Sequence, residues 1–234
     1  MTRVWAVVPA AGTGSRFGGD VPKQYVEIAG RPLIAHTLDA LLAHPRVDGA
    51  MVALGPDDAR WPGWTGLRGK RVLTCVGGAD RAASVLAALD ALALIAGDDT
   101  LVLVHDAARP NLQFADLDRL VAVACDESDG ALLASPVRDT LKRVDASGHS
   151  EGTVPREQLW RALTPQAARL NVLRDALRSA RDAGVAVTDE AMALERAGLR
   201  PRLVEGREDN IKLTAPGDRA LVEFLLQHGH QGSP

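Results

Sequence analysis

The stretch from Val4 to Gln24 constrains this chain more than any other, because it joins an apolar run to a glycine-rich loop. Residues 4–8 form a short run rich in valine, which predicts a buried strand. The run ends at Pro9, and the small residues after it include Gly12 and Gly14. Because glycine has no Cβ, its backbone N–H can approach a ligand closely, and a concave run of such groups binds phosphate. The stretch therefore predicts a strand that ends in a phosphate-binding loop.

Two cations in the same stretch, Arg16 and Lys23, fit a polyphosphate better than a single phosphate. A P-loop is excluded, since no Lys-Ser or Lys-Thr pair follows the glycines. A dinucleotide-binding fingerprint is excluded as well, because its glycines open directly into a helix and Pro22 would interrupt that helix here. The loop thus predicts a nucleotide site of a third kind.

Length and composition limit the class of protein. The chain has 234 residues, of which 46% are hydrophobic, enough for one α/β domain over residues 1–228 with a disordered tail over 229–234. The net charge of -3 gives no basic field for nucleic acid, and no apolar run reaches the ~18–20 residues that cross a bilayer. No secretory signal is visible, and Cys75 and Cys125 lack the spacing of metal ligands. We therefore expect a cytoplasmic protein that binds neither nucleic acid nor membrane.

Strand and helix patterns alternate along most of the chain. Short β-branched runs predict strands, and apolar residues three or four positions apart predict helices. The alternation predicts an α/β fold with a doubly wound, mainly parallel, Rossmann-like sheet. Strands are expected near residues 4–8, 47–54, 71–76, 100–104, 130–135 and 202–204, an extended piece near 25–30, and helices near 32–41, 85–96, 114–125, 170–180, 188–191 (capped by Thr188) and 216–227.

Residues 137–159 break that alternation. They are mostly polar, with alternating character around 140–144 and a turn signal at 145–148. This pattern predicts a β-hairpin arm that projects from the domain. Because the arm has too little apolar surface to form a core of its own, we expect a second subunit to stabilise it, giving a homodimer with interlocked arms.

Polar clusters follow three of the predicted strands: the loop around Gly12, residues 106–109 and residues 210–212. Ligands of open α/β sheets bind beyond the carboxyl ends of the strands, so we expect these clusters to converge. Asp106 follows the most apolar strand, where a carboxylate suits Mg²⁺, an ion that takes a few protein oxygens together with substrate phosphates. His105 is expected to be a hydrogen-bonded structural residue rather than a base.

Other residues give little signal through their spacing alone. Arg156 has the features of a solvated surface charge, and Thr164 and Thr188 are unremarkable in isolation. Arg81 and Ser84 follow a glycine pair, where a helix N-terminus can hold a base or a phosphate. Their assignment therefore depends on a wider resemblance.

Nine stretches of the chain, in order and at sensible spacing, resemble the 2-C-methyl-D-erythritol 4-phosphate cytidylyltransferase family, within the sugar-nucleotidyltransferase-type enzymes. They are PAAGTGSRFG, PKQY, LLAHPRV, GGADRAASV, LVHDAARP, PVRDTLKR, LWRALTPQ, TDEAMALE and VEGREDNIKLT. The resemblance covers nearly the whole chain and makes 1–228 a nucleotidyltransferase domain. It implies CTP as donor, 2-C-methyl-D-erythritol 4-phosphate as acceptor, Mg²⁺ or another divalent cation as cofactor, and a homodimer. The implied products are 4-diphosphocytidyl-2-C-methyl-D-erythritol and pyrophosphate, in the non-mevalonate route to isoprenoids.

The same resemblance implies roles for individual residues, with Arg156 and Thr140 entering from the partner subunit. The implied catalytic residues are Arg16, Lys23, Arg156 and Lys212. The implied nucleotide contacts are Pro9, Ala10, Ala11, Gly12, Gly14, Lys23, Gly78, Arg81 and Ser84. The implied acceptor contacts are Asp106, Arg109, Thr140, Arg156, Thr164, Thr188 and Lys212, with Asp106 also a metal ligand. The family usually has an acidic residue directly after the glycine pair, where this chain has Ala79 and then Asp80.

The chemistry of nucleotidyl transfer explains why cations matter more than a base. The second pKa of a phosphate monoester is about 6, so the attacking oxygen is already ionised at neutral pH. What remains is to bring two polyanions together and to stabilise charge at the α-phosphorus, which is a matter of positioning and electrostatics. Arg16, Lys23, Lys212 and the metal would supply this.

Other functions stay open at this level. The nearest is a ribitol 5-phosphate cytidylyltransferase, whose loop more often has Ala-Gly-Gly where this chain has Ala10-Ala11-Gly12. A dinucleotide-dependent oxidoreductase is disfavoured, because no acidic ribose contact follows the second predicted strand. A non-catalytic nucleotide-binding module would explain the glycine loop, although not Asp106, Arg156 and Lys212 together.

Overall fold

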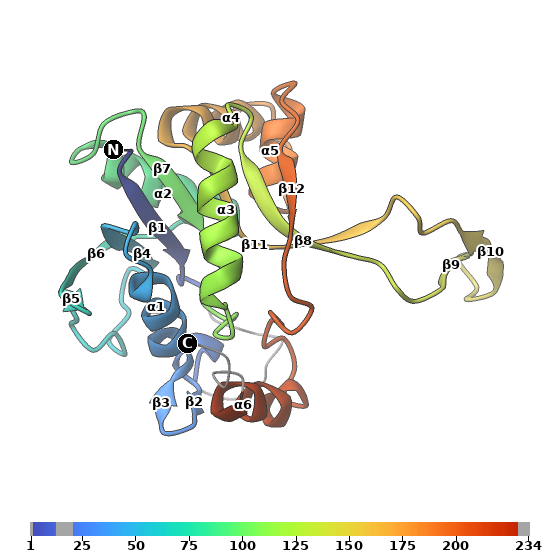
Figure 1. The fold of residues 1–234 in the computed structure, drawn as a ribbon, viewed down its shortest axis with the longest axis horizontal. Coiled ribbons are helices and arrows are strands. Elements are labelled where there is room, and N and C mark those ends of the chain that lie inside the picture. Colours follow the sequence, from blue (N-terminus) through green and yellow to red (C-terminus); the bar gives the residue numbers. More distant parts are fainter. Residues whose placement is uncertain (1, 13–20, 229–234) are drawn as a thin grey trace.

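The computed structural model describes residues 2–12 and 21–228 (Figure 1). Its centre is the parallel trio β4 (Gly49–Leu54), β1 (Val4–Pro9) and β7 (Leu101–Val104). Register pairs Trp5 with Gly49 on one side and with Val102 on the other. All four side chains of β7 are buried, as expected for a parallel strand covered on both faces. The predicted α/β fold with a mainly parallel sheet is confirmed.

The described sheet has eight strands in the order β12-β8-β11-β7-β1-β4-β6-β5. Beyond β4 lie the parallel β6 (Lys70–Val76) and the short antiparallel β5 (Gly66–Leu67). Beyond β7 lie β11 (Trp160–Arg169), β8 (Ala131–Pro136) and β12 (Arg202–Glu205). Strand β11 is antiparallel to both of its neighbours, whereas β12 is parallel to β8.

Sequence analysis missed β11, although it occupies an interior position of the sheet. A proline removes a ladder hydrogen bond and argues against an interior strand, and β11 contains Pro165. The structure accommodates Pro165, which follows a cis peptide bond, at a register shift between Ala162 and Gln166. The strand is therefore compatible with proline only because of an irregularity that the local sequence does not announce.

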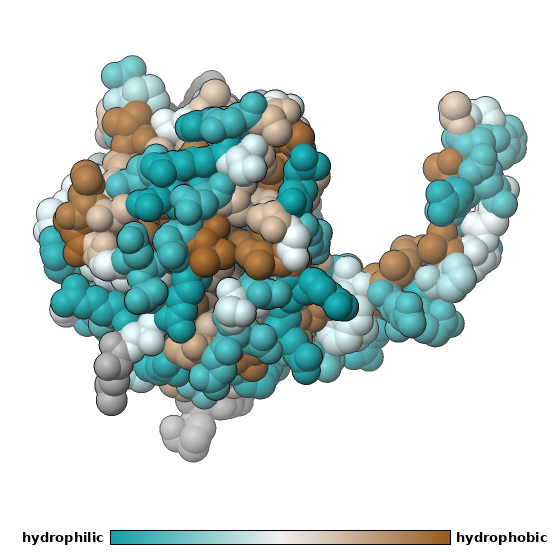
Figure 2. All heavy atoms as spheres, turned by 90° about the horizontal axis from the view of Figure 1, so that it is seen from above, coloured by the Kyte–Doolittle hydropathy of each residue, from teal (hydrophilic) through white to brown (hydrophobic). Residues whose placement is uncertain are grey.

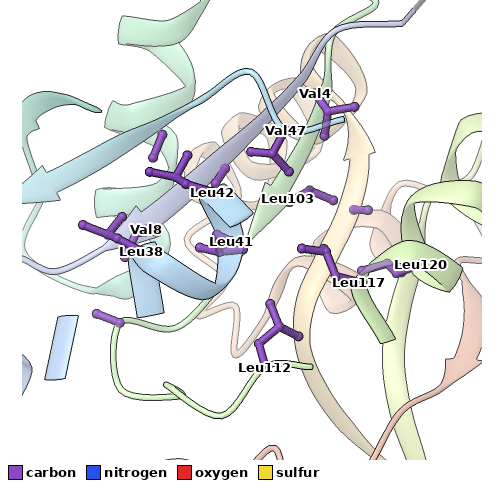
Figure 3. Close-up of a cluster of buried hydrophobic side chains, with 14 of the residues drawn as sticks. Val4, Val8, Leu38, Leu41, Leu42, Val47, Leu103, Leu112, Leu117 and Leu120 are labelled. Atoms are coloured by element: carbon purple, nitrogen blue, oxygen red, sulfur yellow. The ribbon is translucent and has the colours of Figure 1, made fainter. Parts of the chain in front are cut away.

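Helices cover both faces of the sheet, as predicted for a doubly wound fold. On one face α1 (Leu33–Ala43) and α3 (Phe114–Asp126) pack on β1 through Leu41, Leu117 and Leu120, part of the cluster in Figure 3. On the other face α2 (Arg81–Ala93) and α4 (Leu170–Asp182) enclose Trp5 and Val7. Alternate side chains of β1 thus enter two separate cores. The remaining helices are α5 (Glu190–Arg196) and α6 (Asp218–His228).

Two local predictions were wrong in detail. The cap of α5 is Asp189, whose carboxylate accepts the Met192 backbone N–H at 2.9 Å, and not Thr188, which is exposed. An aspartate side chain at this position satisfies an N–H that the helix itself leaves unpaired. Within the predicted extended piece near 25–30, the 3₁₀ turn η1 (Lys23–Tyr25) precedes the small hairpin of β2 (Glu27–Ile28) and β3 (Arg31–Pro32).

The predicted arm is present and projects far from the sheet (Figure 1). It is a two-stranded antiparallel hairpin of β9 (Leu141–Val144) and β10 (Ser150–Val154). The carboxylate of Asp145 closes the turn by accepting the backbone N–H groups of Ser147 and His149, each at 2.9 Å. Figure 2 shows the arm standing clear of the body, with apolar side chains among its polar ones. Val144 is 61% exposed, so the hairpin has no core of its own.

Residues 229–234, predicted to be a disordered tail, lie outside the described residues, as do Gly14 and Arg16 of the glycine-rich loop. Within residues 2–12 and 21–228, no helix combines the length and apolar character needed to span a bilayer.

Candidate active site

A cleft of about 480 Å³ opens beyond the carboxyl ends of β1 and β7. The three polar clusters predicted to converge do so here, because the parallel strands that precede the first two end at the same edge of the sheet. The predicted site residues that line the cleft are Pro9, Ala10, Ala11, Gly12, Lys23, Gly78, Arg81, Ser84, Asp106 and Lys212.

The start of the glycine-rich loop is fixed by a side chain that sequence analysis did not single out. Gln24 is buried, and its amide donates to the carbonyl oxygens of Ala10 at 2.8 Å and Gly12 at 3.1 Å. The Ala10 N–H is donated to Ala53 of the neighbouring strand. Because Gln24 follows Lys23 directly, these bonds join the segment carrying that cation to the loop. No sequence pattern marks a lone glutamine as such a clamp.

A second glycine segment closes against the first. A Cβ built at Gly77 would lie 2.5 Å from the Cβ of Ala11, and one built at Gly78 would lie 2.4 Å from the Cβ of Ala83. No side chain fits at either position without displacing backbone. Ser84 ties the segment to α2 by accepting the Gly78 N–H at 3.1 Å. The two backbones can therefore approach a flat ligand from both sides.

Asp106 directly follows β7 and is surrounded by cations. Its carboxylate accepts Arg81 Nε at 2.9 Å and Arg109 Nε at 3.4 Å, and Lys212 Nζ lies 2.8 Å from Oδ2. Burial alone would raise the pKa of Asp106, but the charges of Arg81, Lys212 and Arg109 hold that pKa far below its usual value. The carboxylate is therefore ionised throughout the physiological range.

Arg81 has a second acidic partner, Glu190, which lies in the first turn of α5 and is 1% exposed. The guanidinium donates through Nη1 to Oε1 at 2.6 Å and through Nη2 to Oε2 at 3.0 Å. Although burial opposes its charge, the neighbouring Glu190 and Asp106 carboxylates raise the pKa of Arg81. Sequence analysis noted Glu190 only as an acid at a helix start, and a pair 109 residues apart leaves no local signal.

Behind Asp106 lies a fully buried hydrogen-bond network. His105 Nε2 is 2.9 Å from the carbonyl oxygen of Arg109, and Nδ1 is 2.9 Å from Thr164 Oγ1. The Thr164 hydroxyl also accepts the Asp106 N–H at 3.2 Å, and Asn210 Nδ2 donates to the Thr164 carbonyl at 2.8 Å. A neutral imidazole with its proton on Nε2 satisfies all of these partners. Burial lowers the pKa of His105 to about 4, so the prediction of a structural histidine is confirmed.

Three of the predicted acceptor contacts do not line the cleft of this subunit. Thr140 and Arg156 are exposed on the arm, where Arg156 Nη1 donates to the carbonyl oxygen of Arg138. Thr188 is exposed before α5, and its nearest polar partner is the Met192 sulfur at 3.5 Å. Two further predicted contacts, Thr164 and Arg109, reach Asp106 from behind and from beside it.

The described residues give little support for Asp106 as a direct metal ligand. Both of its carboxylate oxygens already have cationic partners, and a metal would have to displace them. Across residues 2–12 and 21–228, no group of three or more His, Cys, Asp or Glu side chains is arranged to hold a metal. The donor set of this part of the chain therefore does not form a metal cage at the cleft.

A doubly wound sheet with a glycine-lined, cation-rich cleft at its carboxyl edge is typical of nucleotidyltransferases of Rossmann-like fold, and this protein is one of them. A family model described as 2-C-methyl-D-erythritol 4-phosphate cytidylyltransferase (IspD) matches residues 4–228, and the chain belongs to that family.

Individual relatives agree with this assignment. The chain is 62% identical to the 2-C-methyl-D-erythritol 4-phosphate cytidylyltransferase of Xanthomonas campestris pv. campestris strain 8004, over 98% of this chain and 86% of that protein. It is 62% identical to the protein of the same name from Stenotrophomonas maltophilia strain R551-3, over 95% and 96%. Among solved structures, a 4-diphosphocytidyl-2C-methyl-D-erythritol synthase has a TM-score of 0.81 at 35% identity, over 97% of this chain and 99% of that one. The Thermus thermophilus enzyme has a TM-score of 0.77 at 32% identity, over 97% and 100%.

Proposed function

We propose that this protein transfers CMP from CTP to 2-C-methyl-D-erythritol 4-phosphate, releasing pyrophosphate and forming 4-diphosphocytidyl-2-C-methyl-D-erythritol. One observation carries the proposal: in a chain of this family, the glycine-lined cleft is bordered by Lys23, Arg81 and Lys212 around the carboxylate of Asp106. A polyphosphate needs such a concentration of positive charge, since the net charge of the whole chain is -3.

The donor nucleotide would lie between the two glycine segments. The narrow space between Ala11 and Gly77 supports a flat base there, held mainly by backbone groups near Gly78 and Ser84. The triphosphate would then extend toward Lys23, with Arg16 on the same loop as a second predicted contact. These cations would neutralise charge that develops on the α-phosphate during attack.

The acceptor would enter beside Asp106 and Lys212. An ionised carboxylate accepts hydrogen bonds from polyol hydroxyls, whereas the lysine ammonium attracts the acceptor phosphate. The acceptor oxygen is already ionised at neutral pH, so no side chain has to remove a proton. Positioning of two polyanions is then the main contribution of the protein.

We further propose a homodimer in which the arm of one subunit completes the cleft of the other. The support is geometric: Thr140 and Arg156 do not line the cleft of their own subunit, and the arm exposes apolar side chains at Leu141 and Val144. An exposed two-stranded hairpin is marginal without a partner surface. Sedimentation of the intact protein tests this, and a monomer at micromolar concentration would contradict it.

The proposed cofactor is Mg²⁺ or another divalent cation held by triphosphate oxygens and water, since the described protein donors do not form a cage. The proposed compartment is the cytoplasm. Cys75 and Cys125 are both free thiols, which suits a reducing environment.

The decisive experiment measures pyrophosphate release with CTP and a panel of polyol phosphates, and then with UTP and ATP in place of CTP. We expect turnover with 2-C-methyl-D-erythritol 4-phosphate and CTP to exceed every other combination. Faster turnover with ribitol 5-phosphate would reassign the acceptor. Equal turnover with UTP would show that Ala79 and Asp80 do not discriminate the base.

A further inference from the structure

A buried ion pair lies next to the cleft and contributes nothing that the proposed chemistry requires directly. Glu190 is 1% exposed and sits at the start of α5, whereas Arg81 lines the cleft from the start of α2. Their contact is bidentate, with two N–H···O bonds of 2.6 and 3.0 Å. This arrangement fixes the plane of the guanidinium as well as its position.

The fixed guanidinium has a third contact. Arg81 Nε donates to Asp106 Oδ1 at 2.9 Å, so a single side chain joins α5 to the carboxylate at the end of β7. The other oxygen of Asp106 faces Lys212 at 2.8 Å and Arg109 at 3.4 Å. Each Asp106 oxygen therefore has its own cationic side, and the Arg81 side is set by Glu190.

Charge balance makes Glu190 necessary to this division. In the described cluster three cations, Arg81, Arg109 and Lys212, face two carboxylates, Asp106 and Glu190. Without the Glu190 charge, all three cations would compete for Asp106 alone. The Lys212 side chain is 34% exposed, more than the other two cations, and it is the member best placed to meet a substrate phosphate. Competition for Asp106 would therefore disturb the acceptor side of the cleft.

The fold itself does not require a carboxylate at this position. Removing a carboxylate from water costs free energy that an apolar side chain of similar volume would not cost. A charge retained there is best explained by the geometry that it imposes on its partner. This reasoning separates Glu190 from an ordinary core residue of α5.

We infer that Glu190 is a positioning residue for the transfer reaction: by locking Arg81 it orients the Asp106 carboxylate toward the acceptor and leaves Lys212 available to the acceptor phosphate. This inference rests on the proposed function and extends it to a residue that never touches substrate. It assigns Arg81 to the orientation of Asp106 in addition to its predicted contact with the nucleotide.

The test compares the wild-type enzyme with Glu190→Gln, which keeps the shape of the side chain and removes its charge. We expect kcat/KM for 2-C-methyl-D-erythritol 4-phosphate to fall at least tenfold, mainly through KM, and the Kd for CTP from calorimetry to change less than threefold. The matched control is Glu195→Gln, an exposed residue of the same helix, which should match the wild type. A change below twofold in acceptor kcat/KM for Glu190→Gln would overturn the inference.

A double-mutant cycle tests whether Glu190 acts through Arg81. In an Arg81→Met background, Glu190→Gln should have no further effect on the acceptor KM, and an undiminished effect would overturn the inference. If Glu190→Gln does not fold, Arg81→Lys gives the same test, because a lysine keeps the charge but cannot bridge both carboxylates. Wild-type acceptor kinetics in Arg81→Lys would then refute it. Failure of the proposed function would look different, since the wild-type enzyme itself would release no pyrophosphate.

Discussion

His105 makes the stability of this protein sensitive to mild acid, and the structure allows the size of the effect to be worked out. The imidazole is completely buried and neutral between Thr164 Oγ1 and the Arg109 carbonyl oxygen. A second proton on Nδ1 would face a hydroxyl that already donates to that nitrogen, in a site closed to water. Burial is the main reason that the pKa of His105 falls to about 4.

The magnitude follows from the difference between the folded and unfolded pKa values. An exposed histidine has a pKa of about 6.5, and each pKa unit is worth about 1.4 kcal/mol. Because the folded value is the lower one, the unfolded chain takes up the proton first as the pH falls. The contribution of His105 is therefore fully present above about pH 6.5 and is lost between that pH and about pH 4, for a total of about 3 kcal/mol.

Urea unfolding of the wild type and of His105→Gln, followed by circular dichroism at pH 7.0 and pH 4.5, measures this loss. Over that interval the wild type should lose about 2 kcal/mol more unfolding free energy than the variant. Carboxylates that titrate in the same range affect both proteins equally. His149→Gln, on the exposed arm, is the matched control and should follow the wild type. Equal losses in the wild type and His105→Gln would refute the assignment of a buried neutral imidazole.

Further predictions concern the cleft, the arm and one helix cap. Lys23→Ala should cost about 2–4 kcal/mol of transition-state stabilisation, seen as a loss of kcat with little change in Tm; near-normal turnover would remove Lys23 from the phosphate site. Gly77→Ala should cost about 1–3 kcal/mol of stability and weaken CTP binding, because its Cβ would meet Ala11 at 2.5 Å; unchanged calorimetric binding would contradict the narrow base site. Asp189→Ala should lower the unfolding free energy by about 1 kcal/mol through loss of the α5 cap; an unchanged urea midpoint would contradict it. Arg156→Ala should raise KM for the acceptor but not for CTP, and an effect on CTP alone would contradict the arm proposal.

The predictions from sequence succeeded where local pattern and local chemistry coincide. The valine-rich run at 4–8 and the run at 100–104 became central buried strands, because apolar β-branched residues gain most from burial on both sheet faces. The arm was recognisable as polar, alternating sequence around a turn, which cannot form a core alone. Asp106 was placed correctly at the cleft because a residue directly after a central parallel strand has only one edge of the sheet to occupy.

The predictions failed where a partner distant in the chain decides the structure. Strand β11 contains a proline that local rules exclude from an interior strand, and only the neighbouring strands compensate for it. The cap of α5 differed by one residue, since Thr188 and Asp189 are both good caps and the backbone path selects between them. Gln24 gave no signal, because its hydrogen bonds reach back to a loop whose position depends on the fold.

The amino-acid sequence alone determined the alternating strands and helices, the glycine-lined loop and the residue types that border the cleft, because each is expressed within a short window of the chain. Only the tertiary structure decided which charges neutralise one another. Arg81, Asp106, Glu190 and Lys212 come from four separate segments, and their ion pairs exist only because the sheet order brings those segments to one edge. Electrostatic interaction depends on distance through space and on burial, and neither quantity is written in the order of residues along the chain.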